Sequence, residues 1–263
     1  MSIVSWNMAE KDPQFDHCEF IKGYRSSDIV VIGIQECEDI KPRRREGRRT
    51  RKWREIQRKY LGKSFKCISS HKMGGLFISI HAKQRATRDI QSLQVVDVAC
   101  GVGNVLTNKG AVGVIMRIHN KTLALVNAHL GAHQKHVKQR NADFHRIMQT
   151  LSETATTATT ETALLTGSYD SLLDTHSLLA TENNIIPFDA MVFFGDLNYR
   201  IELTRAKIER IHTRLIKRNK IMRYDQLHRQ RRLKRAFVGF EEGNIRFPPT
   251  YKYNCGADCF DTS

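Results

Sequence analysis

The sequence predicts a layered α/β fold in which strands form sheets and helices pack outside them. Short, apolar, β-branched runs recur along the chain, as is typical of buried strands. Longer segments with apolar residues at three-to-four spacing lie between them, as is typical of amphipathic helices. A hairpin pattern at 111–127 favours sheets with antiparallel pairs over a purely parallel sheet.

The predicted strands are bounded by polar residues that end each apolar run. In the hairpin, Val112, Val114 and Met116 alternate with smaller or polar residues, and Asn120-Lys121 is expected to turn the chain into the next strand. The full set of predicted strands is 3–6, 29–35, 75–81, 93–99, 111–118, 122–127 and 190–194.

The predicted helices follow from apolar residues on one face, as at 201–216, where the opposite face is basic. They are 15–24, 50–61, 135–151, 203–217 and 222–235. Residues 150–184 are rich in Thr and Ser and poor in large apolar side chains, so we expect a mobile surface insertion there. Because the sequence has no internal repeat and no Pro/Gly-rich linker, we expect a single domain over 1–263.

Composition excludes several classes of protein and indicates an anionic partner. Hydrophobic residues make up 40% of the 263 residues, which excludes disorder of the whole chain. No apolar stretch reaches the roughly 18 residues of a membrane span, and no signal peptide is visible. The six cysteines are scattered, which favours a reducing compartment over a disulfide scaffold.

The net charge of +16 is concentrated in two segments, 41–66 and 205–235, each with 13 basic and 2 acidic side chains. Such segments suit nucleic acid, an anionic membrane surface or a phosphorylated small molecule, or they form solvated helix faces. Composition alone does not choose among these.

Four apolar runs each end in a polar residue that can bind a metal or handle a proton: Asn7, Glu36, His129 and Asp196. Asn198 follows two residues after the last of them. Polar side chains at strand ends leave the core and can converge on one edge of a sheet. Each alone is more often a turn residue, but the four together predict a site.

The chemistry of these groups fits metal-assisted hydrolysis of a phosphate ester. Glu36 is a hard oxygen ligand that suits Mg²⁺. Asp196 could accept a proton from an attacking water that Asn198 orients. His129, if charged, could stabilise the phosphorane-like transition state.

Other metal or phosphate sites have weaker support. His129, His133 and His136 suggest zinc, but His129 ends a strand and the predicted helix begins only near 134. Cys255 and Cys259 have no second pair to complete a metal site. Neither a Gly-x-Gly-x-x-Gly nor a P-loop occurs.

The order of these motifs resembles the inositol polyphosphate 5-phosphatases of the endonuclease/exonuclease/phosphatase superfamily. Trp-Asn and Gln-Glu are shared by the whole superfamily, whereas Gly-Asp-Leu-Asn-Tyr-Arg with Pro-Thr-Tyr-Lys-Tyr is highly specific. The resemblance covers nearly all of the chain except the Thr-rich segment, and it implies a DNase I-like four-layer α/β sandwich of two mixed β-sheets flanked by helices. The matching segments are Ser5-Trp-Asn, Gly33-Ile-Gln-Glu36, Asn108-Lys-Gly-Ala-Val112, Asn127-Ala-His-Leu130, Phe194-Gly-Asp-Leu-Asn-Tyr-Arg200 and Phe247-Pro-Pro-Thr-Tyr-Lys-Tyr253.

The resemblance implies a role for each residue of the predicted site. Glu36 would hold Mg²⁺, with Asn7 beside it in contact with metal-bound water or the scissile phosphate. Asp196 and Asn198 would position or deprotonate the nucleophilic water, and His129 would contact the 5-phosphate.

The resemblance also implies two groups of substrate contacts. Tyr251 and Lys252 would bind the 4-phosphate, since a lysine donates a charge-assisted hydrogen bond to an anion and a phenol fixes its orientation. Asn108 and Lys109 would lie on the side of the 1-phosphate.

The chain departs from the family pattern at its end, Asp261-Thr-Ser263. In the family, Pro-Ala-Trp-Cys-Asp-Arg and later Ser-Asp-His follow, and these segments contribute phosphate contacts and the last strands of one sheet. We therefore expect the sequence to be an incomplete record of a longer protein, with those last strands missing and an unpaired sheet edge.

The function implied is magnesium-dependent removal of the 5-phosphate from phosphoinositides, such as phosphatidylinositol 4,5-bisphosphate, or from soluble inositol polyphosphates. The expected location is cytoplasmic, peripheral at the cytosolic face of membranes, where the basic segments contact anionic lipid. Two alternatives are a nuclease of the same superfamily and a catalytically impaired phosphoinositide-binding remnant. The 4-phosphate contacts argue against nucleic acid as a partner, and the sequence does not indicate an oligomeric state.

Overall fold

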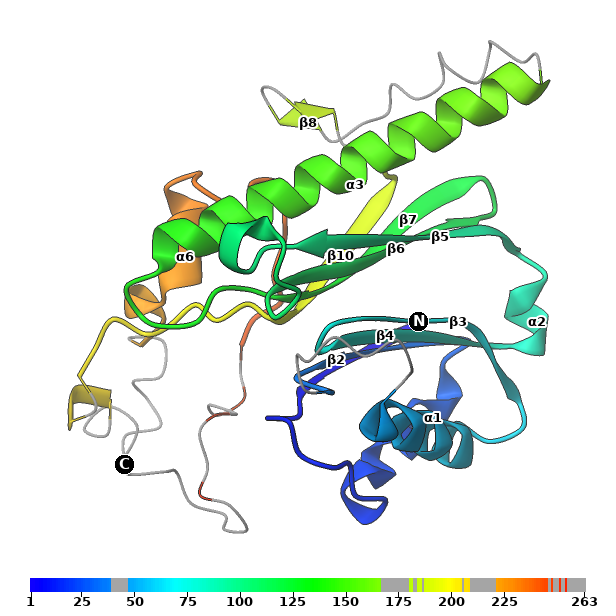
Figure 1. The fold of residues 1–263 in the computed structure, drawn as a ribbon, viewed down its shortest axis with the longest axis horizontal. Coiled ribbons are helices and arrows are strands. Elements are labelled where there is room, and N and C mark those ends of the chain that lie inside the picture. Colours follow the sequence, from blue (N-terminus) through cyan, green and yellow to red (C-terminus); the bar gives the residue numbers. More distant parts are fainter. Residues whose placement is uncertain are drawn as a thin grey trace.

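The computed structural model describes residues 1–38, 47–166, 180–181, 184–185, 187–204, 206–208, 221–245, 247, 251 and 254. These residues form two four-stranded sheets stacked face to face, with helices on both outer faces (Figure 1). Among them no helix is long and apolar enough to cross a membrane. The predicted layered α/β fold is confirmed.

The first sheet has the strand order β1-β2-β4-β3 and the second has the order β10-β7-β6-β5. Strand β1 runs parallel to β2, and β10 runs parallel to β7, while the other pairs are antiparallel. The bounds are β1 (Ser2–Asn7), β2 (Ile29–Gln35), β3 (Phe65–Met73), β4 (Leu76–Lys83), β5 (Ile90–Ala99), β6 (Gly110–Ile118), β7 (Lys121–His129) and β10 (Ala190–Asp196). A separate short pair joins β8 (Ala180–Thr181) to β9 (Asn184–Ile185).

Helices cover the outer face of each sheet (Figure 1). The 3-10 helix η1 (Asp16–Ser26) and α1 (Arg48–Leu61) pack on the first sheet. Helix α3 (Val137–Thr166) packs on the second, on the same side as α6 (Gln226–Arg232). Short helices in the described part of the chain join the elements, among them α2 (Gln84–Thr87), η2 (Val102–Asn104) and η6 (Met222–Tyr224).

Strand β2 explains why the sheets stack so closely. Val30, Ile32 and Ile34 face α1, while Val31 faces the second sheet. A strand buried on both faces needs a continuous apolar run rather than an alternating one. The predicted bounds 29–35 therefore agree with the observed strand.

Two details of the predicted strands are corrected. Strand β3 was not predicted, because it is an edge strand with half-exposed polar residues and lacks a continuous apolar run. In the β6–β7 hairpin the turn residues are His119 and Asn120, both with positive φ (46° and 63°), rather than Asn120-Lys121. Two consecutive positive-φ residues are the signature of a type I′ turn.

Helix α3 is longer than predicted and includes the first part of the supposed Thr-rich insertion. Thr154 and Thr157 donate their hydroxyls to the carbonyls four residues earlier, at 2.8 and 2.9 Å, so these side chains stay compatible with a helix. The buried stripe also continues past the predicted end at 151, from Leu151 (0% exposed) to Ala155 (6%). Most of the remaining segment, up to 184, lies outside the described residues.

The predicted helix 222–235 is interrupted at Asp225. Asp225 accepts a hydrogen bond from the backbone N–H of His228 at 2.7 Å, so this side chain caps and starts a new helix. The predicted helix 222–235 is therefore divided into η6 and α6. Of the predicted helix 203–217, residues 206–208 are described as helical, and 205 and 209–217 lie outside the described part.

Substitution of Leu151 tests whether α3 packs on the second sheet where the Thr-rich segment begins. Leu151→Ala should lower the free energy of unfolding by about 2–5 kcal/mol, because it leaves a cavity in the core. Thr157→Ala, on the exposed side of the same helix, should change it by less than about 0.5 kcal/mol. Urea denaturation followed by circular dichroism measures both, and equal small effects would contradict this packing.

Candidate active site

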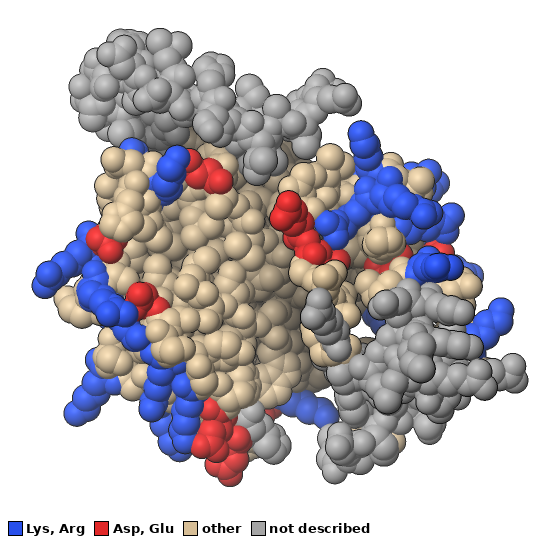
Figure 2. Space-filling model, turned by 180° about the vertical axis from the view of Figure 1, so that it is seen from behind, with Lys and Arg blue, Asp and Glu red and all other residues tan. Residues whose placement is uncertain are grey.

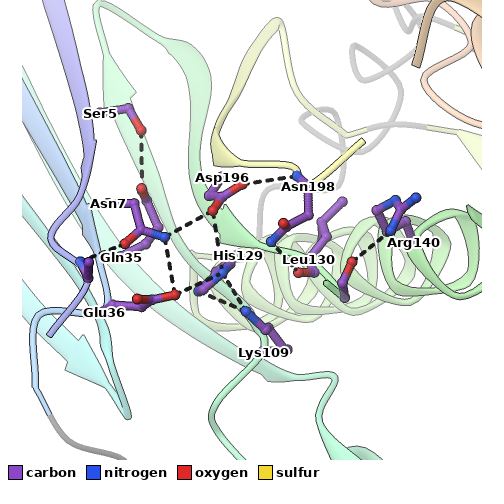
Figure 3. Close-up of polar contacts among 12 residues, drawn as sticks. Ser5, Asn7, Gln35, Glu36, Lys109, His129, Leu130, Arg140, Asp196 and Asn198 are labelled. Atoms are coloured by element: carbon purple, nitrogen blue, oxygen red, sulfur yellow. Dashed lines mark hydrogen bonds and ion pairs between the residues drawn. The ribbon is translucent and has the colours of Figure 1, made fainter. Parts of the chain in front are cut away.

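The four polar strand-end residues meet at one edge of the stacked sheets (Figure 3). Asn7 ends β1 and Glu36 follows β2, while His129 ends β7 and Asp196 ends β10. Since β1 and β2 are parallel, and β7 and β10 are parallel, each pair leaves its sheet at the same edge. The site therefore joins two residues from each sheet.

The distances within this cluster are short enough for one small ligand to contact several members. The Nδ2 of Asn7 donates to Oδ2 of Asp196 at 2.9 Å and to Oε1 of Glu36 at 3.3 Å. The Nε2 of His129 lies 3.6 Å from Asp196 Oδ2 and 3.7 Å from Glu36 Oε1. Carboxylates from both sheets thus lie around one imidazole.

The residues of the cluster differ in solvent exposure, with the imidazole buried and the two carboxylates partly exposed. The His129 side chain is 3% exposed, whereas those of Glu36 and Asp196 are 35% and 31% exposed. Both carboxylates can therefore reach a ligand that enters from solvent, with the ring beneath them.

Lys109 supplies the positive charge beside the imidazole. It directly precedes β6, whose first residue pairs with His129, and its ammonium donates to Nε2 of the ring. Burial, helped by this ammonium, holds the pKa of His129 at about 4, although Asp196 and Glu36 act in the opposite direction. With this pKa the ring is neutral at pH 7, and the positive charge beside it belongs to Lys109, whose own pKa is lowered by burial.

Asn198 supports Asp196 from the next turn of the chain. Its backbone N–H donates to Asp196 Oδ1 at 3.1 Å, and its Nδ2 donates to the carbonyl of Leu130 at 3.0 Å. Its side-chain oxygen accepts from Arg200 at 2.6 Å. Both ends of the amide are thus bonded to protein, and the expected role in orienting water stays a prediction.

Two residues of the cluster region adopt the left-handed backbone conformation. Glu36 has φ 54° and Asn198 has φ 56°. Such residues cost on the order of 1–3 kcal/mol and concentrate at functional sites, where the surrounding structure holds them in place. The turn at Glu36 directs its side chain toward the other sheet at the point where β2 ends (Figure 3).

The side-chain atoms that face the cluster favour Glu36 over Asn7 as a direct metal ligand. The side-chain oxygen of Asn7 accepts the backbone N–H of Ala9 at 2.9 Å, so the group that Asn7 turns to the cluster is its NH₂. No group of three or more His, Cys, Asp or Glu in metal-binding geometry occurs among the described residues. His133 and His136 stack edge to face, 5.4 Å apart, and no zinc site forms with His129 in this part of the chain.

The predicted substrate residues are less completely placed. Asn108 lies in the loop that carries Lys109, with its side-chain oxygen buried against Gly101 and without a hydrogen-bond partner. Tyr251 is 71% exposed. Lys252 lies outside the described residues, as do Cys255 and Cys259, so the 4-phosphate contacts stay a prediction.

Sequence reasoning missed the pair of buried side chains that holds the two loops leaving β7 and β10. Arg140 (0% exposed) donates to the carbonyls of Gly131 and His133 at 2.9 and 2.7 Å. It also donates to Oε1 of Gln226 at 2.7 Å, and the same oxygen accepts the backbone N–H of Arg200 at 2.9 Å. An arginine in a first helical turn gives no sign of burial in the sequence.

Comparison with known proteins gives one family and one fold. A sequence model described as Endonuclease/Exonuclease/phosphatase family 2 matches residues 4–263. Similar curated proteins include type I inositol polyphosphate 5-phosphatase 13 (28% identical over 95% of this chain) and type IV inositol polyphosphate 5-phosphatase 3 (33% over 73%), both of Arabidopsis thaliana. Synaptojanin-2 of Rattus norvegicus is 29% identical over 90% of this chain. The chain spans only 24%, 26% and 14% of the lengths of these three relatives.

Solved structures confirm the expected DNase I-like four-layer sandwich. The inositol polyphosphate 5-phosphatase domain of SPsynaptojanin superposes with a TM-score of 0.73, at 24% identity over 99% of this chain and 70% of that chain. Cimex nitrophorin superposes with a TM-score of 0.67, at 17% identity over 98% of this chain and 80% of that chain. Since a nitrophorin shares this architecture, the fold alone does not specify the chemistry.

Removal of the buried guanidinium tests the support of the site loops. Arg140→Met should lower the free energy of unfolding by about 3 kcal/mol, because the carbonyls and the Gln226 oxygen lose a buried donor. Arg146→Met is the matched control on the same helix, since this exposed side chain donates one hydrogen bond, to Ala99. Urea denaturation of both variants gives the comparison, and an equal loss in the two would contradict the assignment.

Proposed function

Because the chain belongs to endonuclease/exonuclease/phosphatase family 2, we propose that it is a magnesium-dependent phosphomonoesterase. Its substrates are the 5-phosphates of phosphoinositides such as phosphatidylinositol 4,5-bisphosphate and of soluble inositol polyphosphates. The observation that carries the proposal is the cluster of Asn7, Glu36, His129 and Asp196, in which both carboxylates reach solvent. The relatives' names and the inositol (1,4)-bisphosphate and calcium ion in the synaptojanin structure support the substrate class.

The residues present fit Mg²⁺. This cation demands oxygen ligands and keeps several of its waters, so it needs only one or two carboxylates from the protein. Glu36 is a partly exposed carboxylate, and the Asp196 carboxylate reaches the same imidazole from the facing sheet. When bound, the cation would offset negative charge on the phosphoryl oxygens.

The chain's own residues would carry the remaining steps. Asp196 is held by the backbone N–H of Asn198 and by Asn7, and it is placed to accept the proton of an attacking water. The Asn7 NH₂ donates to both carboxylates and so bridges the two sheets at the site. The Lys109 ammonium, buried beside His129, would stabilise the negative charge that develops on phosphate in the transition state.

The membrane part of the proposal rests on charge. Exposed arginines and lysines of α1, Arg48, Arg51, Arg58 and Lys59, suit peripheral binding to anionic lipid at a cytosolic membrane face, at roughly 1 kcal/mol for each cation near the surface. On the described part of the face in Figure 2, Lys and Arg form separate groups with uncharged surface between them. This pattern does not outline a continuous track for a nucleic-acid backbone.

Phosphate release tests the proposal. With Mg²⁺ we expect the chain to release phosphate from inositol 1,4,5-trisphosphate and from vesicles containing phosphatidylinositol 4,5-bisphosphate, and chelation should abolish it. Glu36→Gln and Asp196→Asn should each lower kcat by about 10²–10⁴-fold. Glu55→Gln, an exposed change on α1, is the control and should leave kcat unchanged.

Three outcomes would contradict this activity. Nicking of supercoiled plasmid without release of inositol phosphate would identify a nuclease. Binding of inositol trisphosphate without turnover would identify a phosphoinositide-binding remnant. Unchanged kcat in both site variants would show that the cluster is not the active site.

A further inference from the structure

A buried polar group lies between the two sheets, directly beneath the candidate active site. Asn127 on β7 is 0% exposed and Gln35 on β2 is 1% exposed. Buried apolar side chains form most of the layer between the sheets, among them Val31, Ile78, Ile80, Val112, Val114 and Leu125. A partly exposed contact between His71 on β3 and Asp97 on β5 also joins the sheets, at 2.9 Å. Two amides buried at this one end of the layer need a physical explanation, because burying them is costly unless they are hydrogen-bonded.

The side chain of Asn127 forms hydrogen bonds with residues of the first sheet. Its Nδ2 donates to the carbonyls of Ile34 and Phe77 at 3.2 and 2.9 Å. Its Oδ1 accepts from Gln35 Nε2 at 2.6 Å, and the same Nε2 lies 3.2 Å from Ser5 Oγ. One side chain of the second sheet therefore contacts β2 and β4 of the first, and Gln35 extends the connection to β1.

Gly33 provides the room for this contact. A Cβ at this position would lie 2.5 Å from the ring of Phe194 and 2.7 Å from Cγ of Asn127. Any larger residue would push the second sheet away, so the absence of a side chain lets Asn127 reach the backbone of the first.

The contact lies close in sequence to three of the four residues of the cluster, Asn7, Glu36 and His129. Gln35 directly precedes Glu36, and Asn127 comes two residues before His129. Ser5 likewise comes two residues before Asn7 on β1. A shift between the sheets at this point would therefore move the two halves of the site relative to each other.

We propose that Asn127 and Gln35 are positioning residues that set the spacing of Glu36 from His129 and Asp196 across the two sheets. Apolar packing is non-directional and tolerates small sliding, whereas these hydrogen bonds hold one register. The consequence for catalysis rests on the proposed function, since a misplacement of about 1 Å in a reacting site can cost about 100-fold in rate.

Gln57 offers a matched control for Gln35. It is also a glutamine, also 1% exposed, and its Oε1 lies 3.1 Å from both Ser79 Oγ and His81 Nε2. It belongs to α1, which packs on the outer face of the first sheet, whereas Asn127 contacts the inner face. Gln57→Met and Gln35→Met therefore remove a side chain of the same type, burial and number of contacts, one far from the site and one beneath it.

The experiment compares stability with kinetics for Gln35→Met, Asn127→Leu, the double variant and Gln57→Met. We expect kcat to fall by about tenfold or more in the first three, with KM changed by less than about twofold, and to stay unchanged in Gln57→Met. The double variant should regain stability relative to the single variants, because apolar groups then replace both partners, but kcat should stay low. Recovery of kcat together with stability, or an equal loss of kcat in Gln57→Met, would overturn the proposal.

A crystal structure of Gln35→Met, or of the double variant if that one folds better, supplies a readout that does not need activity. The separation of His129 Nε2 from Glu36 Oε1, 3.7 Å here, should increase in the variant and stay unchanged in Gln57→Met. An unchanged separation would refute the positioning role even if the phosphatase activity is confirmed. Absence of phosphate release by the unaltered chain would refute the proposed function. The structural comparison would then still decide whether Asn127 and Gln35 position the site residues.

Discussion

The stacking of the two sheets in one register is the constraint on which the site depends. Asn7 and Glu36 belong to the first sheet and His129 and Asp196 to the second, so neither sheet alone contains the cluster. The apolar layer between the sheets supplies most of the driving force, since each fully buried aliphatic side chain contributes about 1.5–3 kcal/mol. The buried part of that layer becomes polar at its end next to the site, where Asn127 and Gln35 meet. A partly exposed contact between His71 on β3 and Asp97 on β5 also joins the sheets, at 2.9 Å. A non-directional force thus holds the sheets together, and directional bonds fix how their ends align.

Much of the fold could be predicted because burial on both faces leaves a strong signal in sequence. Strand β2 is apolar along its length for this reason, whereas the edge strand β3 is mostly half-exposed, mixes polar and apolar residues without regular alternation, and gives no such signal. Helix α3 was underestimated because threonine has a low helix propensity. Only the structure shows that the threonine hydroxyls bond to preceding carbonyls within the helix and that a buried stripe at Leu151 and Ala155 packs it on the sheet.

The four residues of the cluster could be predicted from the sequence, but the buried residues that hold them in place could not. A polar residue at the end of an apolar run is visible in sequence, and four such residues meet in space. The burial of Arg140 and Asn127 is not visible in the sequence, since it depends on partners 86 and 93 residues away along the chain. The protonation state of His129 could not be predicted from the sequence either, because its lowered pKa follows from burial of the ring and from the contact with Lys109. A nitrophorin with the same architecture shows that these side chains, rather than the fold, must carry the chemistry.

The central claim is that carboxylates from the two sheets meet around one divalent cation. Anomalous diffraction from crystals soaked in Mn²⁺, a hard cation that can replace Mg²⁺ at oxygen sites, tests this most directly. The account predicts a single strong peak bonded to the Glu36 carboxylate, on the side of Asp196 and His129, that disappears in Glu36→Gln. A peak elsewhere on the molecule that persists in this variant, with none at Glu36, would contradict it.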